Sequence, residues 1–276
     1  MDTCETYLRF LHQGKVRWGH LQGTQVQVLS TAPWADAKPT GERVAQQGVA
    51  CLAPAEPSKI VCVGINYHNH ANEMGHSLPA EPVIFLKPPT ALLDPGQDIL
   101  RPPSSSRVDY EAELALVVGR RVGPGTGAKD AIFGFTCAND VTARDLQKKD
   151  GQWTRGKGFD TFCPLGPVLV RCADVPDARI ECLVNGVGVQ DSRTSQLIFR
   201  PQHIVEFVAE IMTLLPGDVI LTGTPGGIGP LHAGDEVEVR IEGVACCATG
   251  SGIAAKISCW ASPISGYCGV NSNGMP

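Results

Sequence analysis

Only one segment of this chain has the hydrophobic periodicity of a long helix, and this scarcity restricts the folds open to it. The segment begins at Pro201, its apolar residues recur at helical spacing as far as Leu215, and Pro216-Gly217 ends it. Glycine and proline supply 31 and 21 of the 276 residues, as in chains built from short strands and shaped loops. Strands and helices do not alternate regularly, which argues against a doubly wound sheet or a TIM barrel. We predict an α+β fold with few helices, dominated by a mixed or antiparallel β-sheet that curls on itself.

The expected strands are short apolar or alternating runs between turn-forming residues. They cover residues 7–11, 16–21, 26–29, 59–65, 83–86, 114–118, 133–138, 167–171, 179–184, 187–190, 219–222 and 236–241. Asn185-Gly186 separates two of them and is the dipeptide favoured in two-residue type I′ hairpins.

Composition divides the chain into three parts. Residues 1–57 are expected to form a small β-rich N-terminal subdomain that ends in a Pro/Ala-rich linker, and residues 58–245 the main domain. Residues 246–276 are rich in serine, glycine and asparagine, and we expect an atypical tail that packs loosely or is disordered.

Charge and hydropathy exclude several classes of protein. The net charge is −5 with scattered basic residues, so no basic stripe for nucleic acid is present. No apolar run is long enough to cross a membrane, and the first residues lack the pattern of a secretory signal. We therefore expect a cytoplasmic protein. Its 11 scattered cysteines include no Cys-x-x-Cys pair, and we expect reduced, mostly buried thiols.

Glu111 and Glu113 carry the strongest local signal. They precede the apolar run 114–118, and alternation along a strand places them on one face, roughly 6.6–7 Å apart. Two carboxylates there repel each other and lose hydration, and a bound cation would remove both penalties. Oxygen ligands favour Mg²⁺, Mn²⁺ or Ca²⁺ over zinc. The alternative is a strand edge that simply reaches solvent.

Asp140 offers a third carboxylate at a strand-to-helix corner, where a side chain can face a cleft. Thr142 is placed to cap the following helix, on which Arg144 and Gln147 share one face. A guanidinium and an amide beside a carboxylate suit a bound organic acid, although an exposed polar helix face has the same pattern.

Lys157 stands between Gly156 and Gly158, which lets a ligand approach closely. Such a lysine can stabilise a developing enolate or oxyanion, or it can be a solvated loop residue. The Gly/Pro-rich turn at 221–229 lacks the Gly-Lys-Ser/Thr of a phosphate loop. We expect this turn to bring backbone amides and the Thr224 hydroxyl to a small ligand.

His70 and Glu73 are three residues apart and would face each other on a helical turn. The carboxylate can orient the imidazole, so the pair could activate water. A His68/His70 metal pair and a capped surface turn are the alternatives.

Taken in order, these motifs resemble the fumarylacetoacetate hydrolase family over about residues 59–244. They are Val63-Gly-Ile-Asn-Tyr67 with His70 and Glu73, Tyr110-Glu-Ala-Glu-Leu114, Asn139-Asp-Val-Thr-Ala-Arg-Asp145, Gly156-Lys-Gly-Phe-Asp160, Leu165-Gly-Pro167, Gly217-Asp218 and Gly223-Thr-Pro225. The sequence after Val244 departs from the family's usual ending. The N-terminal subdomain is similar to that of the longer bacterial members, and we assign it no catalytic residue.

The resemblance implies a β-sheet roll, usually a homodimer, with Mg²⁺ or Mn²⁺ at its mouth and Ca²⁺ as a possible substitute. Matching positions imply that Glu111, Glu113 and Asp140 are the metal ligands. They imply that Arg144, Gln147, Lys157 and Thr224 face the substrate, and that His70 and Glu73 are the catalytic pair, with Lys157 also acting in catalysis.

The resulting expectation is a metal-dependent enzyme acting on small 2-oxo or enol carboxylic acids. Hydrolysis of the C–C bond of acylpyruvates comes first, with decarboxylation of oxaloacetate at the same site. The alternative is a 2-hydroxyhepta-2,4-diene-1,7-dioate (5-carboxymethyl-2-hydroxymuconate) isomerase or decarboxylase of aromatic catabolism. A ureidoglycolate-type lyase and a non-catalytic binder of oxo acids stay open.

Overall fold

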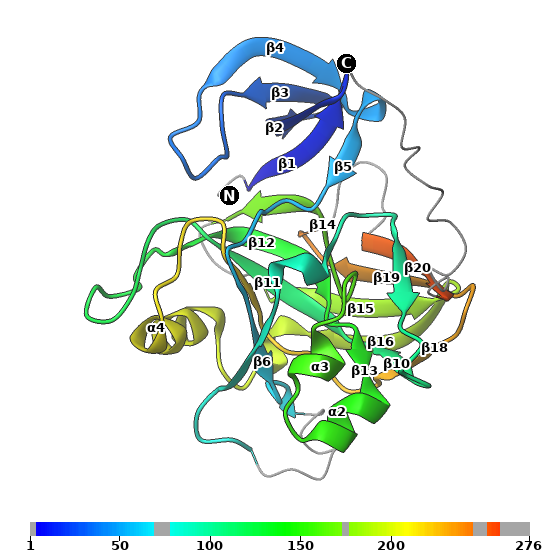
Figure 1. Ribbon diagram of the computed structural model, residues 1–276. Helices are drawn as coiled ribbons and strands as arrows, with labels where there is room; N and C mark the ends of the chain where they lie inside the picture. Colours follow the sequence, from blue (N-terminus) through cyan, green and yellow to red (C-terminus); the bar gives the residue numbers. More distant parts are fainter. Residues whose placement is uncertain (1–3, 69–77, 173–176, 245–252, 260–276) are drawn as a thin grey trace, which may run out of the picture.

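The computed structural model describes residues 4–68, 78–172, 177–244 and 253–259, and β-strands far outweigh helices among them (Figure 1). The largest sheet is 12-stranded, with the order β4-β3-β2-β1-β14-β12-β11-β17-β6-β7, while β5 pairs with β1 and β8 with β14. Its strands are β1 Glu5–His12, β2 Lys15–Gln22, β3 Gln25–Leu29, β4 Pro39–Ala45, β5 Ala50–Leu52, β6 Ile60–Gly64, β7 Val83–Lys87, β8 Leu92–Leu93, β11 Ala112–Val118, β12 Ile132–Asn139, β14 Cys163–Arg171 and β17 Val219–Leu221.

Two smaller sheets complete the β structure. One has the order β13-β10-β18, with β10 Val108–Tyr110, β13 Thr142–Ala143 and β18 Gly229–Leu231. The other has the order β16-β15-β19-β20-β9, with β9 Asp98–Arg101, β15 Arg179–Val184, β16 Val187–Arg193, β19 Glu236–Ile241 and β20 Ile253–Cys259. The β8–β14, β6–β17 and β9–β20 pairs are parallel and the other pairs antiparallel. The predicted α+β fold with a mixed sheet is therefore confirmed.

Helices are few among the described residues. They are α2 Arg144–Asp150, α3 Thr154–Lys157 and α4 Pro201–Ile211, with three short 3-10 turns at Gln46–Gly48, Pro89–Ala91 and Thr194–Gln196. The α4 helix begins at the predicted proline but ends before the expected Leu215. The backbone N–H and C=O of Leu214 both pair with Val122, so the chain leaves the helix to form this bridge. None of these described helices has the length and apolar character needed to cross a bilayer.

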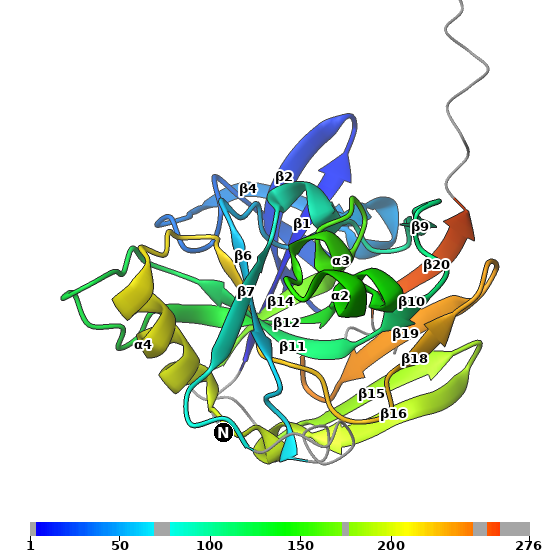
Figure 2. The same cartoon turned by 60° about the horizontal axis from the view of Figure 1, so that its bottom comes forward.

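The strand β11 passes through the middle of the molecule (Figure 2). All seven of its residues are buried, which accounts for the uninterrupted apolar run at 114–118. Leu114, Leu116 and Val118 pack into one hydrophobic cluster with β15, β19 and α4, whereas Ala115 and Val117 pack into a second cluster on the opposite face. Residues at the start of β11 are thus held by packing on both sides.

The N-terminal strands extend the large sheet, because β1 pairs with β14 as well as with β2 and β5. The expected linker is packed: Ala53 and Ala55 are buried, and the Ala53 N–H donates to Asp94 Oδ1 at 2.7 Å. The division of the chain near residue 57 stays a prediction.

Two expectations, one about the cysteines and one about the tail, are wrong in part. Cys4 and Cys172 form a disulfide that ties the start of β1 to the end of β14, so the thiols are not all reduced. Cys62, Cys163 and Cys182 are free and buried, as expected, and Cys137 is buried too. Within the expected loose tail, residues 253–259 form β20, which pairs with β19 and β9. The segment is ordered there because it fills the gap between these two strands.

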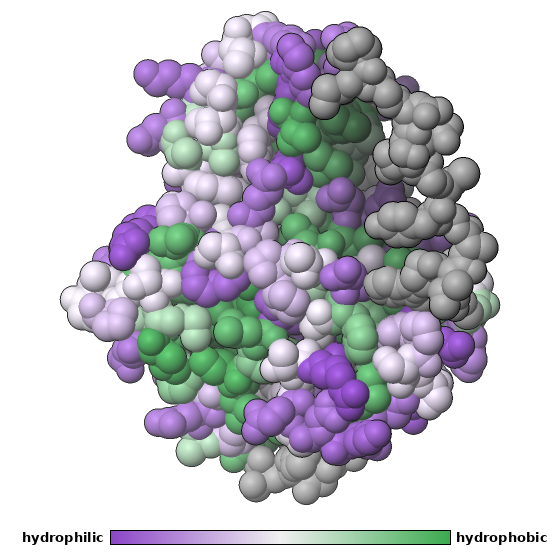
Figure 3. Space-filling view, viewed as in Figure 1, coloured by the Kyte–Doolittle hydropathy of each residue, from purple (hydrophilic) through white to green (hydrophobic). Residues whose placement is uncertain are grey.

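The surface is polar over α2 and α3, whereas apolar side chains gather beside it near β6 and α4 (Figure 3). Val83, Leu86 and Ile211 are the large exposed apolar residues of β7 and α4.

Candidate active site

Three carboxylates converge where the chain passes from the small β10 sheet into the large sheet. Glu111 lies between β10 and β11, Glu113 is the second residue of β11, and Asp140 follows β12 directly. The β11–β12 register pairs Glu113 with Ala138, and the Asp140 N–H donates to the Glu111 carbonyl oxygen at 2.9 Å. One oxygen from each carboxylate lies within 4.8 Å of the others, and all three residues are buried.

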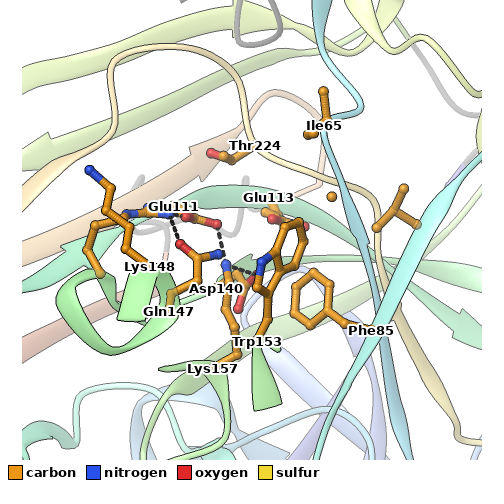
Figure 4. Close-up of a pocket in the computed structure, with 13 residues that line it drawn as sticks. Ile65, Phe85, Glu111, Glu113, Asp140, Gln147, Lys148, Trp153, Lys157 and Thr224 are labelled. Carbon is orange, nitrogen blue, oxygen red and sulfur yellow. Dashed lines mark hydrogen bonds and ion pairs between the residues drawn. The ribbon is translucent and has the colours of Figure 1, made fainter. Parts of the chain in front are cut away.

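Lys157 of α3 lies among these acids (Figure 4). Its Nζ donates to Glu111 Oε2 at 2.7 Å and to Asp140 Oδ2 at 2.6 Å, with its side chain only 3% exposed. A lysine ammonium has three donors, so one is left for a further acceptor. Burial would lower the pKa of Lys157, but the charges of Asp140 and Glu111 raise it, and the lysine stays protonated.

Arg144, the first residue of α2, connects the acids to the helix. Its Nε donates to Asp109 Oδ2 at 2.9 Å, its Nη2 pairs with Glu111, and its Nη1 donates to Gln147 Oε1 at 2.6 Å. The expected shared face of Arg144 and Gln147 is therefore present. Burial would raise the pKa of Glu111, but Lys157 and Arg144 lower it to about 2.

Glu113 differs from Glu111 and Asp140 in its partners. Its Oε2 accepts the Gly223 N–H at 2.6 Å, and in the part of the chain described here no lysine, arginine or histidine forms an ion pair with it. Burial, together with the charges of Asp140 and Glu111, holds the pKa of Glu113 well above its usual range. A divalent cation among the three carboxylates would supply the missing positive charge. Because the donors are all carboxylate oxygens, the set suits Mg²⁺, Mn²⁺ or Ca²⁺.

Lys87, at the end of β7, was not predicted from the sequence. Its side chain is completely buried, and its Nζ lies 2.5 Å from Asp140 Oδ1 and 3.1 Å from the Val141 carbonyl oxygen. Asp140 is thus held by two lysines, one on each oxygen. The available signal was a lysine ending the apolar run 83–86 directly before two prolines.

Thr142 does not cap α2. Its hydroxyl donates to the Asp140 carbonyl oxygen at 2.9 Å, and Ala143 stands at the N-cap without a side-chain hydrogen bond. Thr142 belongs to β13, and this pairing with β10 takes the residue out of the capping position.

The acids face a cavity of about 280 Å³. Thirteen residues line it: Val63, Gly64, Ile65, Phe85, Glu111, Glu113, Asp140, Arg144, Gln147, Lys148, Trp153, Lys157 and Thr224. All the site residues predicted from the sequence are among them except His70 and Glu73, which lie outside the described residues.

The turn after β17 contributes differently from what we expected. The Gly223 amide holds Glu113 instead of pointing to a ligand. The Thr224 hydroxyl does line the cavity, and it accepts a hydrogen bond from Gln190 Nε2 at 3.0 Å. Gln190 Oε1 in turn accepts the Ala112 N–H at 3.0 Å. This buried glutamine, which we did not predict, fixes Thr224 relative to the two glutamates.

Replacing Lys87 with methionine is expected to destabilise the metal-free protein by about 3–5 kcal/mol, the usual effect of removing one partner of a buried ion pair. Asp140 would keep only Lys157. Denaturant unfolding of the variant, with Lys149→Met on the exposed side of α2 as control, measures the effect. Equal stability of the two variants would show that Lys87 does not hold Asp140.

Comparison with known proteins agrees with this geometry. The family described as "Fumarylacetoacetate (FAA) hydrolase C-terminal" matches residues 59–250, and "Rv2993c-like, N-terminal" matches residues 6–54. Oxaloacetate tautomerase FAHD2B of Homo sapiens is 41% identical over 254 residues, 86% of this chain and 77% of that protein.

Solved structures give the same result. The 2-hydroxyhepta-2,4-diene-1,7-dioate isomerase of Mycobacterium marinum superposes with a TM-score of 0.82 and 39% identity, over 92% of this chain and 98% of that one. The 5-carboxymethyl-2-hydroxymuconate delta-isomerase of Mycobacterium smegmatis superposes with a TM-score of 0.83 and 39% identity, over 92% of this chain and 100% of that one. By its motifs, its fold and these matches, the chain belongs to the fumarylacetoacetate hydrolase family.

Proposed function

We propose that this protein is a divalent-metal-dependent enzyme that moves a proton between the 2-oxo and enol forms of a small carboxylic acid. The observation that carries the proposal is the buried triad of Glu111, Glu113 and Asp140 beside a cavity, with Lys157 between two of its members. Enolisation places negative charge on the 2-oxo oxygen. The relatives named above as tautomerase and isomerases act on acids whose chemistry passes through such an enol.

The three carboxylates would hold Mg²⁺ or Mn²⁺. Such an ion acts as a Lewis acid and stabilises negative charge at the 2-oxo oxygen. Arg144, Lys87 and Lys157 hold Glu111 and Asp140 in place at the cavity.

The other residues bind and orient the substrate. The remaining donor of Lys157 is available to an oxygen of the enol, where a preorganised cation stabilises developing charge. Gln147 and Thr224 line the same cavity and offer an amide and a hydroxyl to the substrate carboxylate. The predicted His70–Glu73 pair is our candidate for accepting and returning the proton at C3.

The second candidate is hydrolysis of acylpyruvates, which shares the enolate. The family to which the chain belongs favours this reaction. The predicted His70–Glu73 pair favours it too, since an oriented histidine can also activate water. In that reaction water attacks the distal carbonyl, the C–C bond breaks, and pyruvate and a second acid are formed.

The test uses metal-stripped protein and two substrates. We expect the enol of oxaloacetate to be ketonised faster than in buffer once Mg²⁺ or Mn²⁺ is added, as followed by ultraviolet absorbance. Acetylpyruvate is supplied in parallel, and release of acetate shows hydrolysis. Hydrolysis without ketonisation would move the assignment to the second candidate. If neither reaction occurs in metal-loaded protein, the proposed function is wrong.

A further inference from the structure

The cavity has two unlike walls. One carries the acids and the cationic residues described above, and the other is apolar, formed by Val63, Gly64, Ile65, Phe85 and Trp153. In Figure 4, Trp153 and Phe85 lie next to each other, beside Lys157 and away from Thr224. A small 2-oxo acid bound at the triad would therefore have an aromatic surface next to it.

The Trp153 ring occupies the space that a side chain at residue 64 would need. A Cβ at Gly64 would lie 2.6 Å from Trp153 Cζ3 and 2.8 Å from Cη2, closer than real Cβ atoms come. The glycine is not required by the backbone, because its φ is not among the positive values. Gly64 is thus needed for the close approach of the indole, because the absence of a side chain there lets the ring pack against the end of β6.

Phe85 connects the indole to the polar wall. The two rings meet edge to face, with centroids 5.2 Å apart and planes at 75°, a favoured aromatic geometry. Lys157 Nζ lies 5.1 Å from the centroid of the Phe85 ring, within the range of a cation–π contact. The aromatic wall therefore has a fixed position relative to the lysine that faces the enol.

Ile65 completes the wall in an uncommon conformation. Its φ is 55°, in the left-handed region that β-branched residues rarely adopt. The next residue, Asn66, is buried, and its side chain bonds to Phe199 N, Phe199 O and Thr222 O at 2.7, 3.0 and 2.7 Å. These three bonds hold the turn in which Ile65 lines the cavity. Strained residues of this kind concentrate at functional sites.

We propose that Trp153 and Phe85 determine specificity by binding the part of the substrate beyond C3, and that they select a flat, apolar or conjugated arm over a short carboxylate arm. This inference rests on the proposed function, since the triad must hold the 2-oxo acid end. A conjugated arm can stack on the indole, whereas a carboxylate pressed against the aromatic wall loses hydration without gaining a partner.

Phenylpyruvate and oxaloacetate form a matched pair of probes. They share C1 to C3 and differ in the group on C3, which is a phenyl ring in one and a carboxylate in the other. Ketonisation of both enols is measured in metal-loaded wild type, Trp153→Leu and Trp153→Phe. We expect Trp153→Leu to lower kcat/KM for phenylpyruvate about tenfold, mainly through KM, a change of about 1.4 kcal/mol as expected for an aromatic contact. Oxaloacetate should change less than about threefold, and Trp153→Phe should keep the preference.

Gly64→Ala tests the same wall without removing the indole. The added methyl displaces Trp153, so the ratio of the two kcat/KM values should fall in the same direction as in Trp153→Leu. The inference is wrong if Trp153→Leu leaves the ratio of the two kcat/KM values unchanged. An equal fall of both values would show that Trp153 is merely structural.

Failure of the proposed function is distinguishable from failure of this inference. If neither enol is ketonised by metal-loaded wild type, the proposed function fails. The wall is then tested by calorimetric binding of phenylpyruvate and pyruvate to the metal-loaded proteins. The inference requires weaker phenylpyruvate binding to Trp153→Leu with pyruvate affinity unchanged, and equal affinities of both proteins for phenylpyruvate overturn it.

Discussion

A Glu113→Gln variant is expected to lose metal binding and turnover while its metal-free form remains at least as stable as the wild type. Glutamine keeps an oxygen for the Gly223 N–H and removes a carboxylate that two others repel. No cation is left unpaired, because no ion pair to Glu113 exists within the described residues. Since Lewis-acid stabilisation is worth several kcal/mol, kcat/KM should fall by about a thousandfold.

Three measurements check this prediction: calorimetric titration with Mn²⁺, metal-dependent kcat/KM, and denaturant unfolding without metal. Asp140→Asn is the matched comparison, because it removes the same charge but leaves Lys87 and Lys157 buried without it. Asp140→Asn should therefore also destabilise the metal-free protein by about 3–5 kcal/mol. Undiminished Mn²⁺ affinity in Glu113→Gln would remove this residue from the metal site.

Lys157→Met is expected to lower kcat by about 10²–10³-fold, the usual effect of removing one preorganised donor from a developing oxyanion. Affinity for Mn²⁺ should not decrease, because the substitution removes a cation that competes for Glu111 and Asp140. Loss of turnover with metal binding kept would separate this lysine from the metal ligands.

The same kinetic and calorimetric measurements on Lys149→Met provide the control, since that lysine is exposed on α2 and is not among the residues that line the cavity. If Lys157→Met keeps turnover within about threefold of the wild type, the lysine does not stabilise the enolate. If Mn²⁺ affinity is lost together with turnover, its role is to maintain the site.

Features encoded over a few neighbouring residues could be predicted from the sequence. The apolar run after Glu113 indicated a strand, and β11 covers this run with all seven of its residues buried. Asn185-Gly186 indicated a type I′ hairpin, and both residues have positive φ in the connection between β15 and β16. The alternate positions of Glu111 and Glu113 and the corner at Asp140 indicated the three carboxylates, although Glu111 precedes β11 and is not part of it.

Features that depend on distant partners could not be predicted in this way. The short strand β9 is paired in parallel with β20, which is more than 150 residues away, as in the Asp98–Lys256 pair. The disulfide between Cys4 and Cys172 depends on the pairing of β1 with β14. The ion pair between Lys87 and Asp140 also joins residues far apart in the sequence, and nothing in the sequence around Lys87 indicates this partner.

Deuterium exchange at C3 of pyruvate in D₂O shows whether the protein enolises a 2-oxo acid with the help of a bound metal, because exchange reports enolisation whether the complete reaction is isomerisation or hydrolysis. Metal-stripped protein with Mg²⁺ added back is followed by the loss of the methyl proton signal. We expect exchange that requires Mg²⁺ in the wild type and is absent in Glu113→Gln. Exchange at the same rate without Mg²⁺ or in Glu113→Gln would contradict it, as would no exchange in wild type shown by calorimetry to bind Mg²⁺.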